Sequence, residues 1–487
     1  LRRALFAHLQ TLSYTELDTI GASTMLTRLT SDMNQVQSGV NLTLRLALRS
    51  PFVVFGAMAM AFTIDVHAAS VFAIVIPILF AVVFGVMIVC IPLYRKVQAR
   101  LDRVLGMTRE NLTGVRVLRA FGREEEQKRE FSARNEALTK EQNHVGRISV
   151  LLNPVTYVII NLAIVALIRT GALRVESGAL SQGDVIALYN YMSQILVELI
   201  KLANLVLNIT RAAACCNRIG AVLEIESSQH SPQTEPETTA DAPAIEFCRA
   251  GLRYAGAGGD ALDGISFRAE KGQTIGVIGG TGSGKTTLIN LIPRFYDATE
   301  GSVLVDGVPV EQYPLESLRR RIGVVPQKAV LFHGTIRENL LWGDPDAGDG
   351  TLREALRAAQ AEEIVQSKEG GLDFEIEQGG RNLSGGQRQR LTIARALVRR
   401  PEILILDDSA SALDFATDAA LRKALRALPE RPTVVIVSQR TSSIRHADQI
   451  IVLDNGRMVG LGTHEELLRT CEVYREIHES QYKKEER

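Results

Sequence analysis

The most informative segment of this 487-residue chain is Gly279-Gly280-Thr281-Gly282-Ser283-Gly284-Lys285-Thr286-Thr287. It follows an apolar, β-branched run at 274–278, typical of a buried strand, and precedes 288–291, typical of the start of a helix. Glycines in such a loop let backbone N–H groups turn inward around a polyphosphate, and the helix N-terminus adds its positive end. Lys285 can reach the outer phosphates, and the Thr286 hydroxyl can bind Mg²⁺. The segment therefore predicts a phosphate-binding loop.

The composition indicates two different environments along the chain. Lys plus Arg equals Asp plus Glu, at 55 each, so no basic excess argues for nucleic acid as a partner. Apolar residues are concentrated before residue 225, whereas the remainder resembles an ordinary soluble α/β sequence. The five cysteines show no metal-binding spacing, so we expect buried or inert thiols at Cys90, Cys215, Cys216, Cys248 and Cys471.

Four apolar stretches in the first half are candidate membrane spans, at residues 42–64, 68–94, 148–168 and 185–209. The second is the strongest, because it is apolar on every face over a length that crosses a bilayer of about 30 Å. The fourth carries Glu198 and Lys201 about one helical turn apart. Ionisable residues inside a membrane suggest a substrate path, but these two could equally pair with each other or lie at a membrane interface.

Charge and composition also predict the topology. The charged, helix-favouring region at 95–147 carries many Arg and Lys residues beside a span, which places it on the cytoplasmic side. Four spans then leave both the front of the chain and its second half in the cytoplasm. We therefore expect a multi-pass protein of the plasma or inner membrane, with a transmembrane domain at 1–226, a flexible linker rich in Ser, Pro, Thr and Glu at 227–243, and a cytoplasmic domain at 244–487.

Alternating strand and helix signals follow the linker. We predict strands near Thr274, Ser302, Ile322, Ile403, Thr433 and Gln449, in a mainly parallel sheet that binds ligands at its strand ends. The apolar run at 403–407 delivers the Asp407 carboxylate to such an end, where it would hold Mg²⁺ through water. Ser384, Gly385 and Gly386 form a second helix start that could meet phosphate, although Ser384 could also be a simple cap.

In combination these motifs resemble the nucleotide-binding domain of an ATP-binding cassette (ABC) transporter, and the resemblance covers essentially the entire chain. Residues 279–286 are similar to the Walker A loop, 403–407 to the Walker B strand, and 383–387 to the LSGGQ signature. Gln327 matches the Q-loop, which touches Mg²⁺ and senses the membrane domain. Tyr254 falls where the family stacks an aromatic ring on adenine, and 411–414 matches the D-loop.

The resemblance implies a multi-domain fold, an α-helical transmembrane bundle followed by an α/β P-loop domain with a helical subdomain, as in fused exporters. It implies ATP and Mg²⁺ as cofactors, with each ATP held between one Walker A loop and the signature of a second domain. Nucleotide binding is assigned to Tyr254, Gly279, Thr281, Gly282, Ser283, Gly284, Lys285, Thr286, Thr287 and Gln327. Mg²⁺ is assigned to Thr286, Gln327 and Asp407, and catalysis in the dimer to Asp407, Asp408, Gln439, Ser384, Gly385, Gly386 and Gln387.

Exporter halves have six spans, so by this resemblance the first span and most of the second are missing from the chain. Residues 1–10 resemble the cytoplasmic end of the second span. The regions around 11–28 and 111–121 resemble the intracellular loops whose coupling helices dock on the cassettes.

Two positions depart from the family pattern. Active members have Glu directly after the Walker B Asp, but here Asp408 is shorter by about 1.5 Å, and such a misplacement can cost on the order of 10²-fold in rate. The family has a switch His at the γ-phosphate, but Gln439 cannot carry positive charge or relay a proton. The signature has no such change.

These departures predict the degenerate half of a heterodimeric ABC exporter. Its own site would bind ATP with slow or no hydrolysis, and its signature would complete the site of a partner subunit. The resemblance to heterodimeric drug exporters favours hydrophobic or amphipathic substrates. Two alternatives stay open: a homodimeric lipid or drug exporter in which Asp408 works weakly, and a non-transporting ATP-sensing subunit. A soluble cassette acting on nucleic acid is disfavoured by the span at 68–94.

Overall fold

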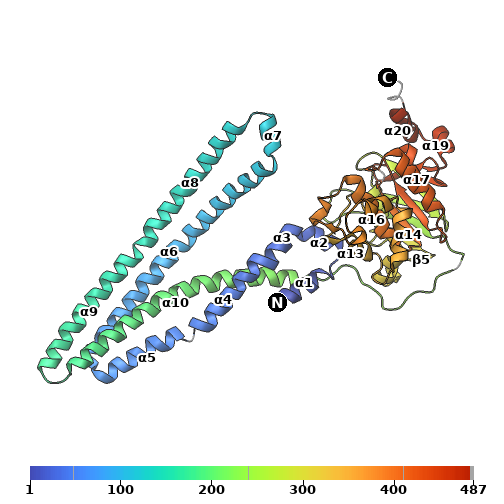
Figure 1. Cartoon of the computed structure of the whole chain (residues 1–487). Helices are drawn as coiled ribbons and strands as arrows, with labels where there is room; N and C mark the ends of the chain where they lie inside the picture. The colour runs from blue at the N-terminus through green and yellow to red at the C-terminus, as the bar shows by residue number, and fades with distance from the viewer. Residues whose placement is uncertain (48, 240, 410, 483–487) are drawn as a thin grey trace. The chain divides into compact units, whose positions relative to one another are not determined.

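The computed structural model describes residues 1–47, 49–239, 241–409 and 411–482 (Figure 1). The chain divides into two compact units. The first comprises Leu1–Phe6 and Ser23–Glu224, and the second comprises Ala7–Ala22 and Ile225–Arg487.

The first unit is all-helical and is dominated by long antiparallel helices (Figure 1). Helix α10 packs along α4 and α5, while α6 packs along α8 and α9. The helices that contribute to this unit are α1 (Arg2–Leu9), α3 (Ala22–Thr27), the π-helical turn Arg28–Asp32, α4 (Met33–Leu46), α5 (Arg49–Ile64), α6 (Val66–Thr113), α7 (Val115–Ala120), α8 (Glu124–Val150), α9 (Leu152–Glu176) and α10 (Gln182–Leu223).

Three helical stretches within the described residues are long and apolar enough to cross a membrane: Ala22–Ile64, Val66–Thr113 and Glu124–Glu176. They contain the first three predicted spans, and the strongest of these lies within the single helix α6. The fourth predicted span, 185–209, lies within α10 but is not one of the three, so it stays a prediction.

Glu198 and Lys201 pair with each other on α10. The Lys201 ammonium lies 2.8 Å from Glu198 Oε1, and the Ser50 hydroxyl of α5 donates to Glu198 Oε2 at 2.7 Å. The Glu198 side chain is buried, with 4% of the residue exposed. The pairing that the sequence left open is therefore present within α10, and the bond from Ser50 joins α5 to α10.

The second unit is built on a six-stranded sheet in the order β12-β11-β3-β10-β9-β6. All its neighbours are parallel except β11 and β12, which confirms the predicted mainly parallel sheet. The strands are β3 (Thr274–Gly279), β6 (Ile322–Val325), β9 (Ile403–Asp407), β10 (Thr433–Val437), β11 (Gln449–Asp454) and β12 (Arg457–Gly462).

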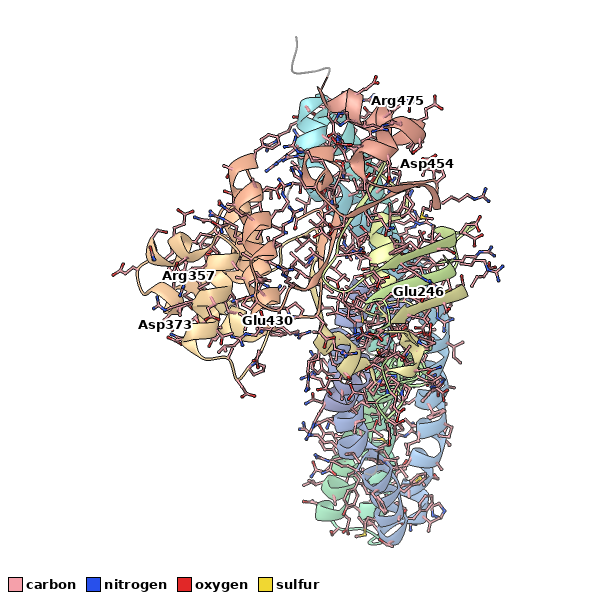
Figure 2. The ribbon with its side chains drawn as sticks, turned by 90° about the vertical axis from the view of Figure 1, so that its right-hand side faces the viewer. Glu246, Arg357, Asp373, Glu430, Asp454 and Arg475 are labelled. Carbon is pink, nitrogen blue, oxygen red and sulfur yellow. The ribbon has the colours of Figure 1, made fainter. Side chains whose placement is uncertain are left out.

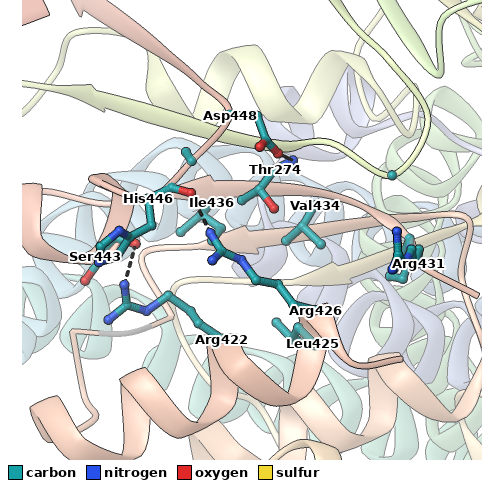
Figure 3. A pocket seen from close by; sticks show the side chains of 13 residues that line it. Thr274, Arg422, Leu425, Arg426, Arg431, Val434, Ile436, Ser443, His446 and Asp448 are labelled. Carbon is teal, nitrogen blue, oxygen red and sulfur yellow. Dashed lines mark hydrogen bonds between the residues drawn. The ribbon is translucent and has the colours of Figure 1, made fainter. Parts of the chain in front are cut away.

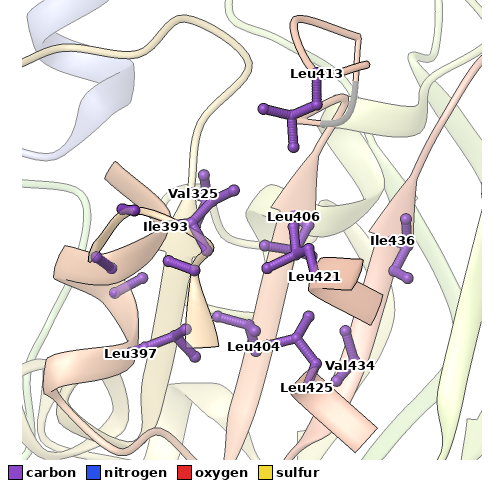
Figure 4. Packing of buried hydrophobic residues seen from close by; sticks show 14 of the residues in the cluster. Val325, Ile393, Leu397, Leu404, Leu406, Leu413, Leu421, Leu425, Val434 and Ile436 are labelled. Atoms are coloured by element: carbon purple, nitrogen blue, oxygen red, sulfur yellow. The ribbon is translucent and has the colours of Figure 1, made fainter. Parts of the chain in front are cut away.

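Both faces of this sheet are covered by apolar core. On β9, Leu404 and Leu406 pack into one hydrophobic cluster, whereas Ile403 and Ile405 pack into another. Figure 4 shows the first cluster, in which side chains of α16 (Gly385–Val398) and α17 (Phe415–Arg426) meet the strands. A parallel strand buried on both faces is expected to be a continuous apolar run, and this one is.

A second sheet, β2-β1-β4-β5, is antiparallel. It contains the strand predicted near Ser302, so placing that strand with the parallel set was wrong. The reason is that β4 pairs in register with β1, with Val303 opposite Phe247, rather than with a strand of the P-loop sheet. The strands are β1 (Ile245–Leu252), β2 (Leu262–Ala269), β4 (Glu300–Val305) and β5 (Val308–Pro309), and a separate pair joins β7 (Gly334–Thr335) to β8 (Glu375–Ile376).

Helices surround these sheets, and a mainly helical region spans residues 336–398. Figure 2 shows Arg357 and Asp373 of this region set apart from Glu246 on β1. The remaining helices of the unit are α2 (Tyr14–Ile20), α11 (Lys285–Leu291), α12 (Leu315–Arg321), α13 (Ile336–Leu341), α14 (Asp349–Ala358), α15 (Glu362–Gln366), α18 (Thr441–Ile444), α19 (His464–Thr470) and α20 (Glu472–Tyr482).

The predicted linker contains no helix or strand among its described residues, but part of it is bonded to the second unit. Arg294 Nη1 donates to the His230 carbonyl at 3.0 Å, and the Leu315 N–H donates to Ser231 Oγ at 3.0 Å. These bonds hold His230 and Ser231 in a segment whose composition predicts a flexible linker.

The cysteines are all free thiols, as expected from their spacing. Cys90, Cys215 and Cys471 are buried, whereas Cys216 and Cys248 are exposed, so for these two only the expectation of an inert thiol remains, and it stays a prediction. Cys248 is exposed because it occupies an outward-facing position of β1.

Candidate nucleotide-binding site

The predicted phosphate-binding loop connects the end of β3 to the start of α11. Gly282 and Gly284 have φ angles of +82° and +97°, a left-handed region in which residues with side chains are strained. A Cβ atom on Gly284 would also lie 2.9 Å from the Ala261 carbonyl oxygen. The loop therefore requires glycine at these positions, and its backbone passes close to the start of β2.

Lys285 begins α11 and turns its ammonium group back across the loop. Its Nζ donates to the carbonyl oxygens of Gly279 at 3.0 Å and Gly280 at 2.6 Å. Burial lowers the pKa of Lys285, while the carboxylates of Asp408 and Asp407 act in the opposite direction. A cation is thus held at the mouth of the loop, where it can meet an anionic phosphate.

Thr286 and Asp407 come together from different elements. The Thr286 hydroxyl lies 3.2 Å from Oδ2 and 3.3 Å from Oδ1 of Asp407, which ends β9. Burial raises the pKa of Asp407, and the bond from Thr286 partly offsets this shift. A hydroxyl and one carboxylate beside phosphate oxygens is the usual protein contribution to a Mg²⁺ site. Within the described residues, no cluster of three or more His, Cys, Asp or Glu side chains offers a different metal site.

Asp408 follows directly and faces the same site. Gln327 Nε2 lies 3.4 Å from Asp408 Oδ2, so Gln327 joins the group through Asp408 rather than through Thr286 or Asp407. Burial raises the pKa of Asp408, while Gln327, Lys285, Arg440 and the backbone N–H of Gln439 lower it. Gln439 comes near Asp408 because β10 pairs with β9, and the Asp408 N–H donates at 3.0 Å to the carbonyl of Val437, two residues before Gln439.

Tyr254 lies on the other side of the loop. Its hydroxyl lies 3.1 Å from Thr287 Oγ1, and its ring meets that of Tyr296 edge-on at 5.1 Å. A cavity of about 490 Å³ opens here, a size typical of small-molecule sites. It is lined by Tyr254, Asp260, Ala261, Gly282, Gly284, Lys285, Thr286, Thr287, Asn455 and Gly456.

Four of these lining residues were missed by the sequence reasoning: Asp260, Ala261, Asn455 and Gly456. A signal existed for the last two, because an Asn-Gly pair between two strands is typical of a tight hairpin turn. It connects β11 to β12, and both residues have positive φ angles. No comparable local signal marks Asp260.

The predicted signature forms the start of α16 and does not line this cavity. Ser384 Oγ accepts from the Gln387 N–H at 3.3 Å, and the Ser384 N–H donates to Gln387 Oε1 at 3.0 Å. Ser384 therefore caps the N-terminus of α16, which is one of the two roles that the sequence allows for it. Gly385 and Gly386 lie in the first turn of the helix, and a contact with phosphate from a second domain stays a prediction.

A second cavity, of about 330 Å³, lies at the opposite ends of β3 and β10 (Figure 3). Its arginines already bond to the chain: Arg422 Nη1 donates to the Ser443 carbonyl at 3.3 Å, and Arg426 Nη2 to the His446 carbonyl at 2.5 Å. Asp448 accepts from the Thr274 N–H at 2.7 Å. The polar side chains of this cavity therefore bond to the main chain around them, and the cavity is separate from the phosphate-binding loop.

Comparisons with known proteins agree with this architecture. Residues 1–199 match the ABC transporter transmembrane region, and residues 262–411 match the ABC transporter domain. An uncharacterized ABC transporter ATP-binding protein of Mycobacterium tuberculosis, Rv1273c, is 40% identical over 99% of this chain and 83% of its own length. The probable multidrug resistance ABC transporter ATP-binding/permease protein YheI of Bacillus subtilis is 34% identical over 99% of this chain and 82% of its own.

A solved structure has the same fold. It is a bacterial Atm1-family ABC exporter with ATP bound, matched with a TM-score of 0.82 at 24% identity, over 99% of this chain and 84% of that one. The predicted fold class, a helical membrane region followed by an ABC nucleotide-binding domain, is confirmed. With its helical first unit, its P-loop second unit and relatives that match over almost its whole length, the chain belongs to the ABC transporter family and has the exporter-type fold.

Proposed function

We propose that this chain is the degenerate-site half of a heterodimeric ABC exporter. It would bind ATP and Mg²⁺ at its own Walker motifs with slow or no hydrolysis, and its signature would complete the hydrolytic site of a partner subunit. One observation carries the proposal: Asp408 and Gln439, which both depart from the family pattern, follow the paired ends of β9 and β10, where the Asp408 N–H donates to the Val437 carbonyl, whereas the signature is intact.

The position of Asp408 supports weak catalysis. Its backbone N–H donates to the Val437 carbonyl at 3.0 Å, so its Cα is fixed by the sheet and cannot move forward to replace a missing methylene. Its carboxylate is already close to Gln327. The carboxylate would fall short of an attacking water by about 1.5 Å, and we expect a rate loss on the order of 10²-fold.

At position 439 a glutamine replaces the switch His of the family, so a second catalytic group is absent. A neutral amide can donate a hydrogen bond to the γ-phosphate, but it adds no positive charge to the transition state. The amide is therefore compatible with holding ATP and poorly suited to cleaving it. Lys285, Thr286 and Asp407 remain available for the phosphates and for Mg²⁺, which supplies charge neutralisation when it is bound.

The substrate proposal rests on the relatives. YheI, which is named as a probable multidrug resistance transporter, matches almost the whole of this chain. We extend this class to the present chain and propose hydrophobic or amphipathic compounds as its cargo. The apolar helices would lie in the plasma or inner membrane, with the second unit in the cytoplasm.

Hydrolysis by the full-length protein, purified without any second subunit, tests the proposal. We expect near-background Mg-ATP turnover, and we expect the double variant Asp408→Glu, Gln439→His to raise it by about 10²-fold. The same double variant carrying Lys285→Ala is the matched control, because it removes the phosphate contact and should return turnover to background.

The alternatives predict different results. Brisk turnover by the unmodified chain would mean that Asp408 suffices, and a homodimeric exporter would replace the heterodimer. Restored hydrolysis without transport in vesicles, even with a partner subunit present, would favour an ATP-sensing subunit.

A further inference from the structure

We propose that Gln481, on the C-terminal helix α20, is a positioning residue for the segment that carries Gln439. The inference rests on the proposed role of Gln439 at the γ-phosphate. The inference assigns to Gln481, 42 residues after Gln439, the role of orienting that segment.

The contact uses both ends of the Gln481 amide. Its Nε2 donates to the Gln439 carbonyl oxygen at 2.7 Å. Its Oε1 accepts from the Thr441 N–H at 2.9 Å and from the Thr441 hydroxyl at 3.0 Å. One side chain thus bridges two backbone groups on either side of Arg440, because an amide carries a donor and an acceptor on separate atoms.

The bridged segment is a short connection, in which the Ser438 hydroxyl accepts from the Arg440 N–H at 2.9 Å. Strand β10 ends at Val437 and α18 begins at Thr441, so residues 438–440 belong to neither element. The Gln439 carbonyl accepts from Gln481, and the end of the strand that leads to Gln439 is bonded to Asp408, whose backbone N–H donates to the Val437 carbonyl at 3.0 Å. A displacement at Gln481 would therefore move Gln439 relative to Asp408.

Helix α20 is a firm support for this contact. Tyr474 on the same helix is fully buried in the core, and its hydroxyl lies 2.7 Å from His464 Nδ1. His478, one turn before Gln481, lies 3.2 Å from the Thr441 hydroxyl through Nδ1. The helix thus meets the segment at two points while its other face is packed in the protein.

The consequence concerns the distinction between ATP and ADP. Gln439 is proposed to meet only the γ-phosphate, so a misplaced Gln439 should weaken binding of a triphosphate and leave ADP binding unchanged. We expect Gln481→Ala to lower the preference for a non-hydrolysable ATP analogue over ADP by roughly fivefold, the equivalent of one net hydrogen bond.

The experiment measures dissociation constants of AMP-PNP and ADP, both with Mg²⁺, on the full-length protein in detergent. Ser480→Ala is the matched control, because the Ser480 hydroxyl donates within its own helix, to the Ile477 carbonyl. Gln481→Glu is a nearly isosteric variant that keeps the acceptor for Thr441 but cannot donate to Gln439, and it should also lower the preference.

Two results would overturn the inference. Equal weakening of AMP-PNP and ADP would mean that Gln481 only stabilises the domain. An unchanged ratio in both Gln481 variants would mean that the segment is positioned without it. Neither result depends on hydrolysis, so they are distinguishable from a failure of the heterodimer proposal, which turnover measures.

Discussion

The phenol oxygen of Tyr296 lies 2.5 Å from Oδ2 of Asp18, so two residues 278 positions apart in the sequence share a hydrogen bond. Asp18 is on helix α2, and the Tyr296 ring meets the ring of Tyr254 at the predicted nucleotide site. Burial and then Asp18 raise the pKa of Tyr296, so its hydroxyl stays protonated at physiological pH and acts as the donor. Tyr296 therefore connects α2 to the nucleotide side of the second unit.

We predict that Tyr296→Phe loosens α2 without disturbing the aromatic packing. The phenylalanine ring can still contact Tyr14, whose ring centroid lies 6.0 Å away, but the bond to Asp18 is lost. Amide hydrogen exchange across α2 should become about fivefold faster, since one net hydrogen bond is removed. Asp18→Asn is the control, because an amide oxygen can still accept. If exchange is the same in Tyr296→Phe and the unmodified protein, the other contacts of α2 hold the helix without this bond.

The phosphate-binding loop provides a paired test of two glycines. Gly284→Ala should destabilise the second unit by about 1–3 kcal/mol, because the residue has a φ of +97° and its Cβ would lie 2.8 Å from Leu262 Cδ2. Gly280→Ala should leave the thermal midpoint nearly unchanged, since no atom lies within 4 Å of its Cβ position. Thermal unfolding in the absence of nucleotide measures both. Equal midpoints for the two variants would contradict the account of the loop.

The contact between Thr286 and Asp407 predicts a metal-dependent phenotype. Asp407→Asn keeps the size of the side chain but removes the charge proposed to hold Mg²⁺. We expect nucleotide affinity with Mg²⁺ to fall about tenfold, and affinity in EDTA to change little. Fluorescent-nucleotide titrations with and without EDTA measure the difference. Asp448→Asn, at the opposite end of the sheet, is the control and should not alter either affinity. A similar loss with and without metal would assign Asp407 a structural role instead.

The parts of the fold that the sequence predicted are those with strong local signals. Strands β9 and β10 each contain four consecutive apolar residues, because both faces of the parallel sheet are buried. The phosphate-binding loop is a contiguous motif, and α6 contains a long apolar run. Each feature depends on neighbours in the chain, so reading along the sequence was sufficient.

The missed features depend on contacts between distant segments. Strand β1 has irregular register on both sides, with a break between Phe247 and Ala250 against β2, so its alternation of apolar and polar residues is disturbed. Gln481 meets a segment that is 40 residues away in sequence, at Thr441, and nothing in the local sequence of α20 indicates this partner. Asp260 likewise reaches the cavity only through the folding of the chain. Residues of this kind need tertiary structure to be found.

Glu198 and Lys201, the ion pair on α10, should differ in how much stability is lost when each is substituted. Glu198 keeps 5% of its side chain exposed, whereas Lys201 keeps 41%. Lys201→Met would leave a buried carboxylate that keeps its bond from Ser50 but loses its ion-pair partner, and should cost about 2–4 kcal/mol. Glu198→Gln retains the bond to Ser50 and leaves the ammonium of the less buried side chain, so it should cost less than Lys201→Met.

The double variant Glu198→Gln, Lys201→Met then separates a structural pair from a substrate path. Removing both charges should recover most of the stability lost in Lys201→Met, because no buried charge is left unpaired. Thermal midpoints in lipid nanodiscs measure this recovery, and uptake of an amphipathic dye into inverted vesicles containing both proposed subunits measures transport. We expect transport to be retained, since Glu198 and Lys201 form an ion pair with each other. Recovered stability with lost transport would show instead that the pair contributes to the path of the substrate.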